Sequence, residues 1–185
     1  YKYKTDYWRK GGGFPTPTGK LELYSTVLEE LGYDPLPQFV EPGESPYSTP
    51  ELYKEYPYVL TSGYRAPFYF LAQYRNIPWL RSFMVYPVTQ INPETAAKHG
   101  IKDGGWIWIE SPRGRIRQVA RVFPGIDPRV VMATGNWFYP EEPAPLHGLT
   151  ISNPNMLTSN DHFDPMYGAP DLTCLLCKIY KVEKK

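Results

Sequence analysis

The sequence is poor in the side chains on which most metal sites and nucleophilic enzymes depend. Among its 185 residues there are two cysteines and three histidines. Cys174 and Cys177 have the C-x-x-C spacing of redox and metal motifs, but they lie in the strand-like segment LTCLLCKIYKV and no second ligand pair accompanies them. The histidines, His99, His147 and His162, are scattered rather than clustered. We therefore expect no metal ligand and no catalytic residue in this chain, and a pair of buried thiols in its last strand.

An excess of one charge and long apolar runs are also missing. The chain has 20 Lys and Arg against 19 Asp and Glu, a net charge of +1, without a basic cluster. Neither nucleic acid nor an anionic membrane is therefore an expected partner. No apolar run approaches a membrane span and no signal peptide is visible, so we expect no direct membrane insertion. The sequence starts at Tyr1 rather than Met, which suggests a piece of a longer protein and leaves its compartment open.

Proline and tyrosine, by contrast, are abundant, with 21 and 16 residues. This composition favours turn-rich structure and aromatic packing over long helices. Prolines and polar residues dominate the first third of the chain, whereas apolar strand-like segments recur after it. We therefore divide the chain into an N-terminal arm and linker, residues 1–57, and one domain, residues 58–185.

The arm contains few signals of regular structure. Leucines alternate with polar residues at 21–23, which predicts a short strand. Ser25 can cap a short helix over 26–31, and Gly32 suits its end. From 33 to 57 prolines and glutamates dominate, and we expect an extended segment without a core of its own.

The most legible stretch begins at Asn92, a good N-cap, with Pro93 at the first helical position. Gly100 suits the left-handed position that ends a short helix. A strand is then expected at 106–110 and, after a turn, a second strand from Arg115. A short helix followed by a hairpin with apolar residues on both strand faces favours a small closed barrel. Further strands are expected at 129–134 and 173–182.

A candidate anion site follows the strand predicted at 58–61. Thr61 and Ser62 supply hydroxyl groups, Gly63 permits a ligand to approach the backbone, and Arg65 can fork onto a phosphate. These residue types in one loop at a strand end indicate a site for an anion. On composition alone, the alternative is a plain turn with a solvated arginine.

Several segments, taken in order, resemble signatures of one enzyme family. They are FPTPTGKLELYS, LTSGYR, LAQYRNIPWLR, INPETAAKHGIKDGGWIWIESPRG, GNWFYPE and SNPNMLT. Together they are similar to the C-terminal domain of molybdenum and tungsten oxidoreductases of the dimethyl sulfoxide reductase family, in its acetylene hydratase-like and thiosulfate reductase-like branch. The resemblance covers most of the chain, and its specificity comes from the order of the segments rather than from any one of them.

The resemblance implies a mainly β fold, a six-stranded double-psi β-barrel with short helices and a long irregular N-terminal arm. It implies one bound molybdopterin guanine dinucleotide, with molybdenum or tungsten held by the remainder of the enzyme. Expected partners are the remaining domains of the parent catalytic subunit and an iron–sulfur electron-transfer subunit. The metal-ligand residue and the iron–sulfur cysteine motif of such enzymes are not found in this sequence, so we expect no turnover by the chain alone.

The resemblance also implies which residues contact the cofactor. They are Thr61, Ser62, Gly63, Arg65, Gln73, Asn92, Asn136, Asn153 and Asn155. The first four would hold the pterin and diphosphate region, Asn92 the guanosine end, and Asn153 and Asn155 the pterin edges, because an amide offers both a donor and an acceptor. Two alternatives stay open. Gln73 would otherwise lie on an exposed helix over 68–75, and Asn92 would already use its oxygen as a helix cap.

Other functions remain as competitors. A barrel used only for protein contact, with aromatic loops as its interface, would bind no cofactor. A carbohydrate-binding barrel would need Trp79 and Trp137 to be exposed and coplanar. An autonomous enzyme is disfavoured, because the scattered histidines cannot be combined into a nucleophile, base and orienting group.

Overall fold

The computed structural model describes residue 11 and residues 13–183. Residues 1–10, 12 and 184–185 lie outside this description, and with them the first part of the expected N-terminal arm. The chain divides into two compact units, Tyr1–Val40 and Glu41–Lys185. Within the described part, no helix has the length and apolar character needed to cross a membrane.

In the first unit, helix α2 (Thr26–Glu30) forms where the sequence predicts it. Ser25 Oγ accepts a hydrogen bond from the backbone N–H of Leu28 at 3.2 Å, which satisfies one of the free donors of the first turn. Gly32, just beyond the helix, has φ of +78°. Local capping rules are therefore sufficient to place this helix.

Two expectations for the arm are wrong. The segment 21–23 forms no strand and leads into a bend at 23–24, and Glu22 accepts hydrogen bonds from the N–H and the hydroxyl of Thr18 at 3.0 and 2.8 Å. The stretch expected to be extended contains helix α3 (Pro50–Glu55). Its proline lies at the first helical position, where the missing N–H costs nothing and the ring favours the helical φ.

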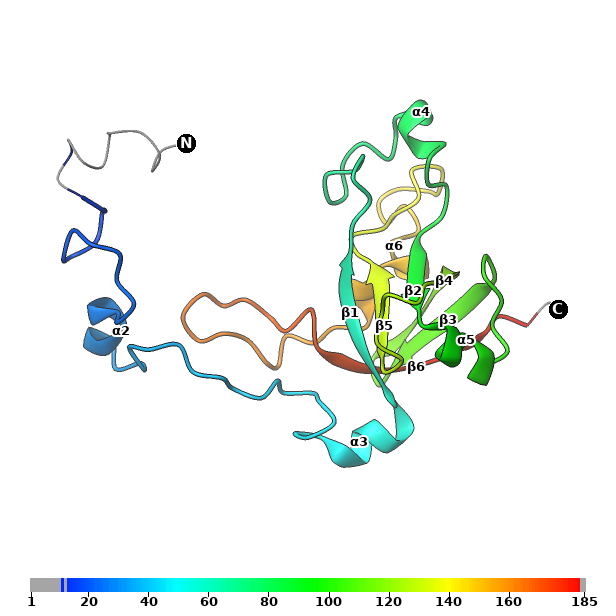
Figure 1. The fold of residues 1–185 in the computed structure, drawn as a ribbon. Helices are drawn as coiled ribbons and strands as arrows, with labels where there is room; N and C mark the ends of the chain where they lie inside the picture. Colours follow the sequence, from blue (N-terminus) through cyan, green and yellow to red (C-terminus); the bar gives the residue numbers. More distant parts are fainter. Residues whose placement is uncertain (1–10, 12, 184–185) are drawn as a thin grey trace. The chain divides into compact units, whose positions relative to one another are not determined.

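A closed barrel of six strands forms the centre of the second unit (Figure 1), in the order β1-β5-β2-β4-β3-β6. The strands are β1 (Tyr58–Tyr64), β2 (Val88–Ile91), β3 (Trp106–Ser111), β4 (Gly114–Val122), β5 (Val130–Thr134) and β6 (Leu175–Lys181). β1 runs parallel to β5 and β2 parallel to β4, whereas the other neighbours are antiparallel. The mainly β, six-stranded barrel is confirmed, and each predicted strand of the domain falls on one of these. The double-psi crossing stays a prediction.

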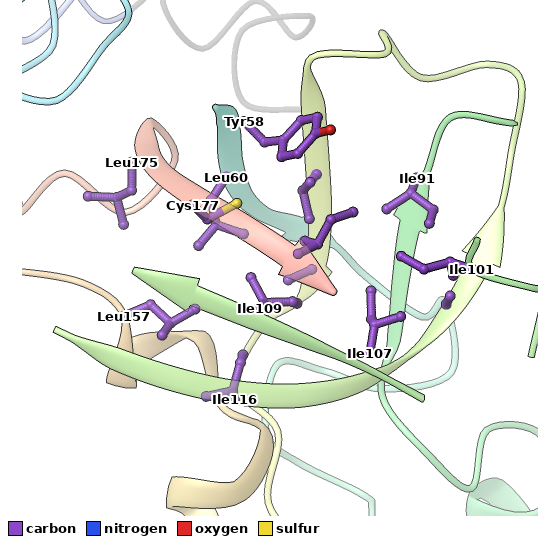
Figure 2. Close-up of a cluster of buried hydrophobic side chains, with 14 of the residues drawn as sticks. Tyr58, Leu60, Ile91, Ile101, Ile107, Ile109, Ile116, Leu157, Leu175 and Cys177 are labelled. Atoms are coloured by element: carbon purple, nitrogen blue, oxygen red, sulfur yellow. The ribbon is translucent and has the colours of Figure 1, made fainter. Parts of the chain in front are cut away.

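The barrel is filled by aliphatic side chains from alternate strand positions. Ile107 and Ile109 of β3 are fully buried, whereas Trp108 between them is partly exposed on the outer face. Figure 2 shows the isoleucines of β3 with Ile91 and Cys177 in one cluster inside the barrel. Burial of each such aliphatic side chain contributes about 1.5–3 kcal/mol. The core thereby holds the strand ends, which carry the loops, in fixed positions.

The cysteines do not form the expected buried pair. Cys177 is fully buried in β6, and burial raises the pKa of its thiol. Cys174 precedes the strand and is partly exposed, with its thiol 3.7 Å from the carbonyl oxygen of Glu44. Cys174 lies in a bend and not in β6, so the packing of the strand against the barrel does not bury it. The prediction of two buried thiols is therefore wrong.

Short helices connect the strands. Helix α5 (Pro93–Lys98) is confirmed, since Asn92 Oδ1 accepts from the N–H of Glu94 at 2.9 Å and Gly100 has φ of +57°. Helix α6 (Leu149–Ser152) and the 3-10 helix η1 (Pro154–Met156) follow β5 in the chain and pack on β4.

The segment 68–75 forms turns and no helix, so the alternative of an exposed helix face for Gln73 does not apply. Leu71 and Tyr74 have positive φ values of 53° and 72°. The carbonyl of Leu71, which in a helix would accept from the backbone N–H of Arg75, accepts from the guanidinium of Arg75 at 3.0 Å. Helix α4 (Pro78–Arg81) begins only after these turns.

A largely buried ion pair joins the residues before β1 to the barrel. Arg113, in the turn between β3 and β4, donates through both terminal nitrogens to the carboxylate of Glu44, Nη2 to Oε2 at 3.0 Å. The N–H of Leu176 donates to the same carboxylate at 3.2 Å. Arg113 Nε also donates to the carbonyl of Leu157 at 2.6 Å. We call the contacts of Glu44 with Arg113 and Leu176 the Glu44 clamp.

The Glu44 clamp predicts a loss of stability in acid. Burial alone would raise the pKa of Glu44, but hydrogen bonds from Arg113 and Leu176 outweigh it and lower that pKa. A carboxyl whose folded pKa is lowered stabilises the fold above its unfolded pKa of about 4.3 and loses this effect as pH falls further. We expect Glu44→Gln to cost about 1.5–3 kcal/mol at pH 7, the usual contribution of hydrogen bonds to charged groups.

The same substitution should cost progressively less below about pH 4, because protonation of Glu44 removes the same charge from the wild type. Urea unfolding of both proteins between pH 7 and pH 3 measures the difference. A difference that stays constant over this range would contradict the role given to the carboxylate.

Candidate functional site

The ends of β1 and β5 lie side by side, because these strands run parallel and pair Tyr64 with Thr134. Gly135 follows β5, and a Cβ there would lie 3.0 Å from the carbonyl oxygen of Ser62. Glycine therefore lets the two backbones approach here, whereas any other residue would push them apart by a few tenths of an ångström. The parallel pairing thus brings the candidate loop after Thr61 next to the loop that carries Asn136.

Arg65, just beyond β1, has an exposed side chain. Within the described part of the chain it forms no ion pair or hydrogen bond. With Arg75 it lines a hollow of about 10 Å³, enough for one water molecule. Of the neighbouring candidates, Ser62 donates its hydroxyl to the carbonyl of Leu172 at 3.0 Å, and Gly63 is exposed. The guanidinium of Arg65 is therefore available to a ligand.

The loop at Asn136 is held by a buried guanidinium. Asn136 has φ of +54°, and its carbonyl accepts a hydrogen bond from Arg75. Arg75 also donates to Gly135 at 3.4 Å and to Leu71 at 3.0 Å. The side chain of Arg75 is almost wholly enclosed, and this loss of solvation lowers its pKa to about 10. The group stays charged at neutral pH and fixes the backbone of the loop.

Trp137 packs against two arginines. The guanidinium carbons of Arg75 and Arg81 lie 4.4 and 5.1 Å from the centre of its ring. Trp137 is fully buried, whereas Trp79 is 65% exposed. The two tryptophans therefore form no shared exposed platform, which removes the observation that a carbohydrate-binding barrel would need.

Asn153 follows α6 and is buried, unlike the exposed Asn155. Its Oδ1 accepts from the backbone N–H of Asn155 at 3.0 Å, whereas no hydrogen bond in the described part of the chain uses its side-chain NH₂. The carbonyl of Ser152 is fixed by Gln118 Nε2 at 2.8 Å. The amide donors of Asn153 are thus held in place without an internal partner.

Two adjoining hollows lie beside these amides. One, of about 260 Å³, is lined by Asn136 and Asn153. The other, of about 530 Å³, is lined by Gln73, which is exposed. The hollows share Phe138 and His147 as walls. The structure thereby brings together Gln73, Asn136 and Asn153, while the side chain of Asn155 lines neither hollow.

Asn92 is not part of this group. β2 runs antiparallel to β5 and pairs Ile91 with Val131, so Asn92 lies beside the start of β5 while Asn136 follows its end. Both ends of its side-chain amide also have internal partners, because Oδ1 caps α5 and Nδ2 donates to the carbonyl of Ile126 at 2.7 Å. The role expected for Asn92 at the guanosine end stays a prediction without support from this geometry.

The sequence reasoning missed the buried polar network beneath the site. Gln118 of β4 is fully buried and accepts from the hydroxyl of Thr89 at 2.8 Å. It exchanges two hydrogen bonds of 3.0 Å with the backbone of Thr134 and reaches Ser152. The available signal was a glutamine on the strand face that otherwise carries Ile116 and Ala120.

The residues at this end of the barrel suit an anionic group with polar edges. None of the residues that line the three hollows is acidic, whereas Arg65 and Arg75 are basic. The Nε atoms of Arg75 and Trp137 are buried, and no described residue accepts a hydrogen bond from either. Free amides, an unpaired guanidinium and glycines that allow close approach together fit a dinucleotide with a diphosphate and a planar heterocycle.

Comparison with known proteins gives a family for residues 58–175, which match the family described as "Molydopterin dinucleotide binding domain". Among curated proteins, dopamine dehydroxylase of Eggerthella lenta is 39% identical over 173 residues, covering 91% of this chain and 17% of that protein. Acetylene hydratase of Syntrophotalea acetylenica is 38% identical over 180 residues, covering 93% of this chain and 24% of that protein. The chain thus spans about a quarter or less of the length of these relatives.

Among solved structures, "Acetylene Hydratase from Pelobacter acetylenicus" superposes on this chain with a TM-score of 0.83 at 36% identity. The match covers 94% of this chain and 25% of that one. The barrel and its loops are therefore shared with one part of a much larger protein.

Proposed function

Because the chain belongs to the molydopterin dinucleotide binding domain family, we propose that it binds one molybdopterin guanine dinucleotide as the C-terminal domain of a larger molybdenum or tungsten oxidoreductase. The observation that carries the proposal is the set of unpaired donors at one barrel end. Arg65 lines one hollow there, Asn136 and Asn153 line another, and no acidic residue lines either hollow.

Each residue of this set has a distinct task in the proposal. Arg65 forks onto a phosphate oxygen pair, which its unpaired guanidinium can do with two parallel hydrogen bonds. Gly63 and Gly135 let the diphosphate approach the backbone. The side-chain amides of Asn136 and Asn153 meet the polar edges of a heterocycle, for which they offer both donors and acceptors. Thr61 and Ser62 border the same loop with their hydroxyls.

The bound group supplies redox chemistry at a metal that the remainder of the enzyme holds. The residues of this chain bind and orient it. We propose that the other domains of the parent catalytic subunit pack against this one and that an iron–sulfur subunit delivers electrons. Exposed aromatic side chains beside the site support such packing, among them Trp79 at 65% and Phe83 at 66% exposure.

Binding of guanosine 5′-diphosphate to the 185-residue chain tests the proposal by isothermal titration calorimetry. We expect saturable binding that Arg65→Ala weakens by roughly tenfold to a hundredfold, because hydrogen bonds to a charged group contribute about 1.5–3 kcal/mol. Arg115→Ala is the matched control, since Arg115 is exposed on the outer face of β4 and should leave the affinity unchanged.

The outcomes separate the competing functions. Equal affinity of the Arg65→Ala protein and the wild type would contradict the phosphate site. Absence of nucleotide binding in all three proteins would favour a barrel that serves only as an interaction module.

A further inference from the structure

A larger hollow lies apart from the proposed cofactor site. It measures about 640 Å³ and is bordered by the turn after α5, the start of β3 and the end of β6. It shares no lining residue with the hollows beside Arg65, Asn136 and Gln73. The family signatures discussed above do not assign a ligand to it. Its size falls within the range of about 300–1,000 Å³ typical of small-molecule pockets.

The charge around this hollow is mainly positive. Lys102, Arg117 and Lys181 line it, against Glu183 as the single acid. None of the three basic side chains forms an ion pair with a described residue. Lys181 Nζ lies over the turn after α5, 3.4 Å from the position that a Cβ on Gly100 would take. The hollow therefore presents three cations against one acid, and none of the three is ion-paired with a described residue.

Aromatic and aliphatic side chains form the remaining walls. The rings of Tyr86 and Trp106 meet edge to face at 5.2 Å, and Tyr86 is 49% exposed. The guanidinium of Arg117 lies 5.5 Å from the centre of the Trp106 ring. Ile101 and Val182 add apolar surface. The aromatic walls suit a flat apolar group, and the basic side chains suit an anion. A ligand that carries both groups would therefore make more contacts than a purely hydrophobic or a purely anionic one.

The geometry points to a second binding site, for a planar aromatic anion whose ring packs against Tyr86 and Trp106 and whose carboxylate or phosphate meets Lys102 and Lys181. The site is independent of the dinucleotide proposal, because no lining residue is shared and either can fail alone. An aromatic carboxylate is the simplest molecule that carries both required features.

The probe is 2-naphthoate, compared with 2-naphthamide, which keeps the ring but not the charge, and with cyclohexanecarboxylate, which keeps the charge but not the aromatic ring. Nuclear magnetic resonance of the ¹⁵N-labelled 185-residue chain follows the indole N–H of Trp106 and the amide of Ile101. We expect saturable shifts of both signals with 2-naphthoate, at an affinity at least fivefold above that for either analogue. Equal affinity for the neutral amide would overturn the proposal.

Two variants localise the charge contribution. Lys102→Gln and Lys181→Gln should each weaken 2-naphthoate binding about twofold to fivefold, the effect of one exposed ionic contact, and raised salt should weaken it further. Lys54→Gln is the control, because Lys54 lies on α3 and pairs with Glu51 outside the hollow. Unchanged affinity in both hollow variants, with folding verified by their amide spectra, would overturn the site.

The Arg65→Ala variant keeps the two proposals apart, because Arg65 does not line this hollow. It should bind 2-naphthoate as tightly as the wild type does. Weaker binding of 2-naphthoate by Arg65→Ala than by the wild type would overturn the independence of the second site.

Discussion

The variant Gln118→Leu is expected to lower the free energy of unfolding by at least about 4 kcal/mol, because it leaves four buried polar groups unpaired at roughly 1–3 kcal/mol each. Leucine fills a similar volume but offers no donor or acceptor. The hydroxyl of Thr89, the N–H and carbonyl of Thr134 and the carbonyl of Ser152 would all lose their partner. Urea unfolding followed by circular dichroism measures the change.

Gln90→Leu provides the matched control for this variant. Gln90 lies on β2 and is only partly buried, and its side chain makes no hydrogen bond within the described residues. We expect the control to change stability by no more than about 0.5 kcal/mol, as most substitutions outside such networks do. If both variants unfold at the same urea concentration as the wild type, the buried network does not stabilise the barrel as its geometry indicates.

Arg75→Met is expected to weaken guanosine 5′-diphosphate binding by tenfold or more while changing the unfolding free energy much less. Two effects oppose each other in stability. Methionine avoids the cost of burying a charge, but three carbonyls of the turns at Leu71, Gly135 and Asn136 lose their donor. Nucleotide binding is affected in two other ways, and both weaken it. The loop that carries Asn136 loses the hydrogen bonds that fix it, and the site loses a positive charge. Calorimetry and urea unfolding of the same preparation separate the two quantities.

Arg81→Met is the control for Arg75, because Arg81 stacks on the same tryptophan ring yet pairs with Glu141 rather than with the loop. It should bind the nucleotide nearly as well as the wild type. Arg75→Lys should not restore binding, since an ammonium lacks the planar fork that reaches several carbonyls at once. Full binding by the lysine variant would show that only the charge of Arg75 matters.

Most of the barrel could be predicted because its signals are local. The cap at Asn92, the glycine at position 100 and the strand alternation around Ile107 and Ile109 each depend on neighbouring residues alone. The features that could not be predicted depend on backbone conformations that no local pattern encodes. The sequence does not indicate the positive φ values at Leu71 and Tyr74, which place Arg75 in a buried position instead of on an exposed helix face.

Only part of the candidate site could be predicted from the sequence. Sequence signatures locate polar loops but carry no information on which end of the barrel each loop reaches, since this depends on strand direction and pairing. Parallel pairing of β1 with β5 brings Arg65 and Asn136 together, whereas antiparallel pairing of β2 with β5 sends Asn92 to the other end. Gln118 was overlooked because a single polar residue in an apolar strand acquires meaning only when its partners, distant in sequence, are known.

The Glu44 clamp has a practical consequence for anyone who shortens this protein. The family match begins at residue 58, so trimming by similarity would retain Arg113 and discard the acid that neutralises it. The remaining barrel would carry an unmatched cation beside the turn between β3 and β4, with the N–H of Leu176 also left without its acceptor. A soluble fragment for crystallisation or library display should therefore start no later than Glu41, where the compact unit itself begins.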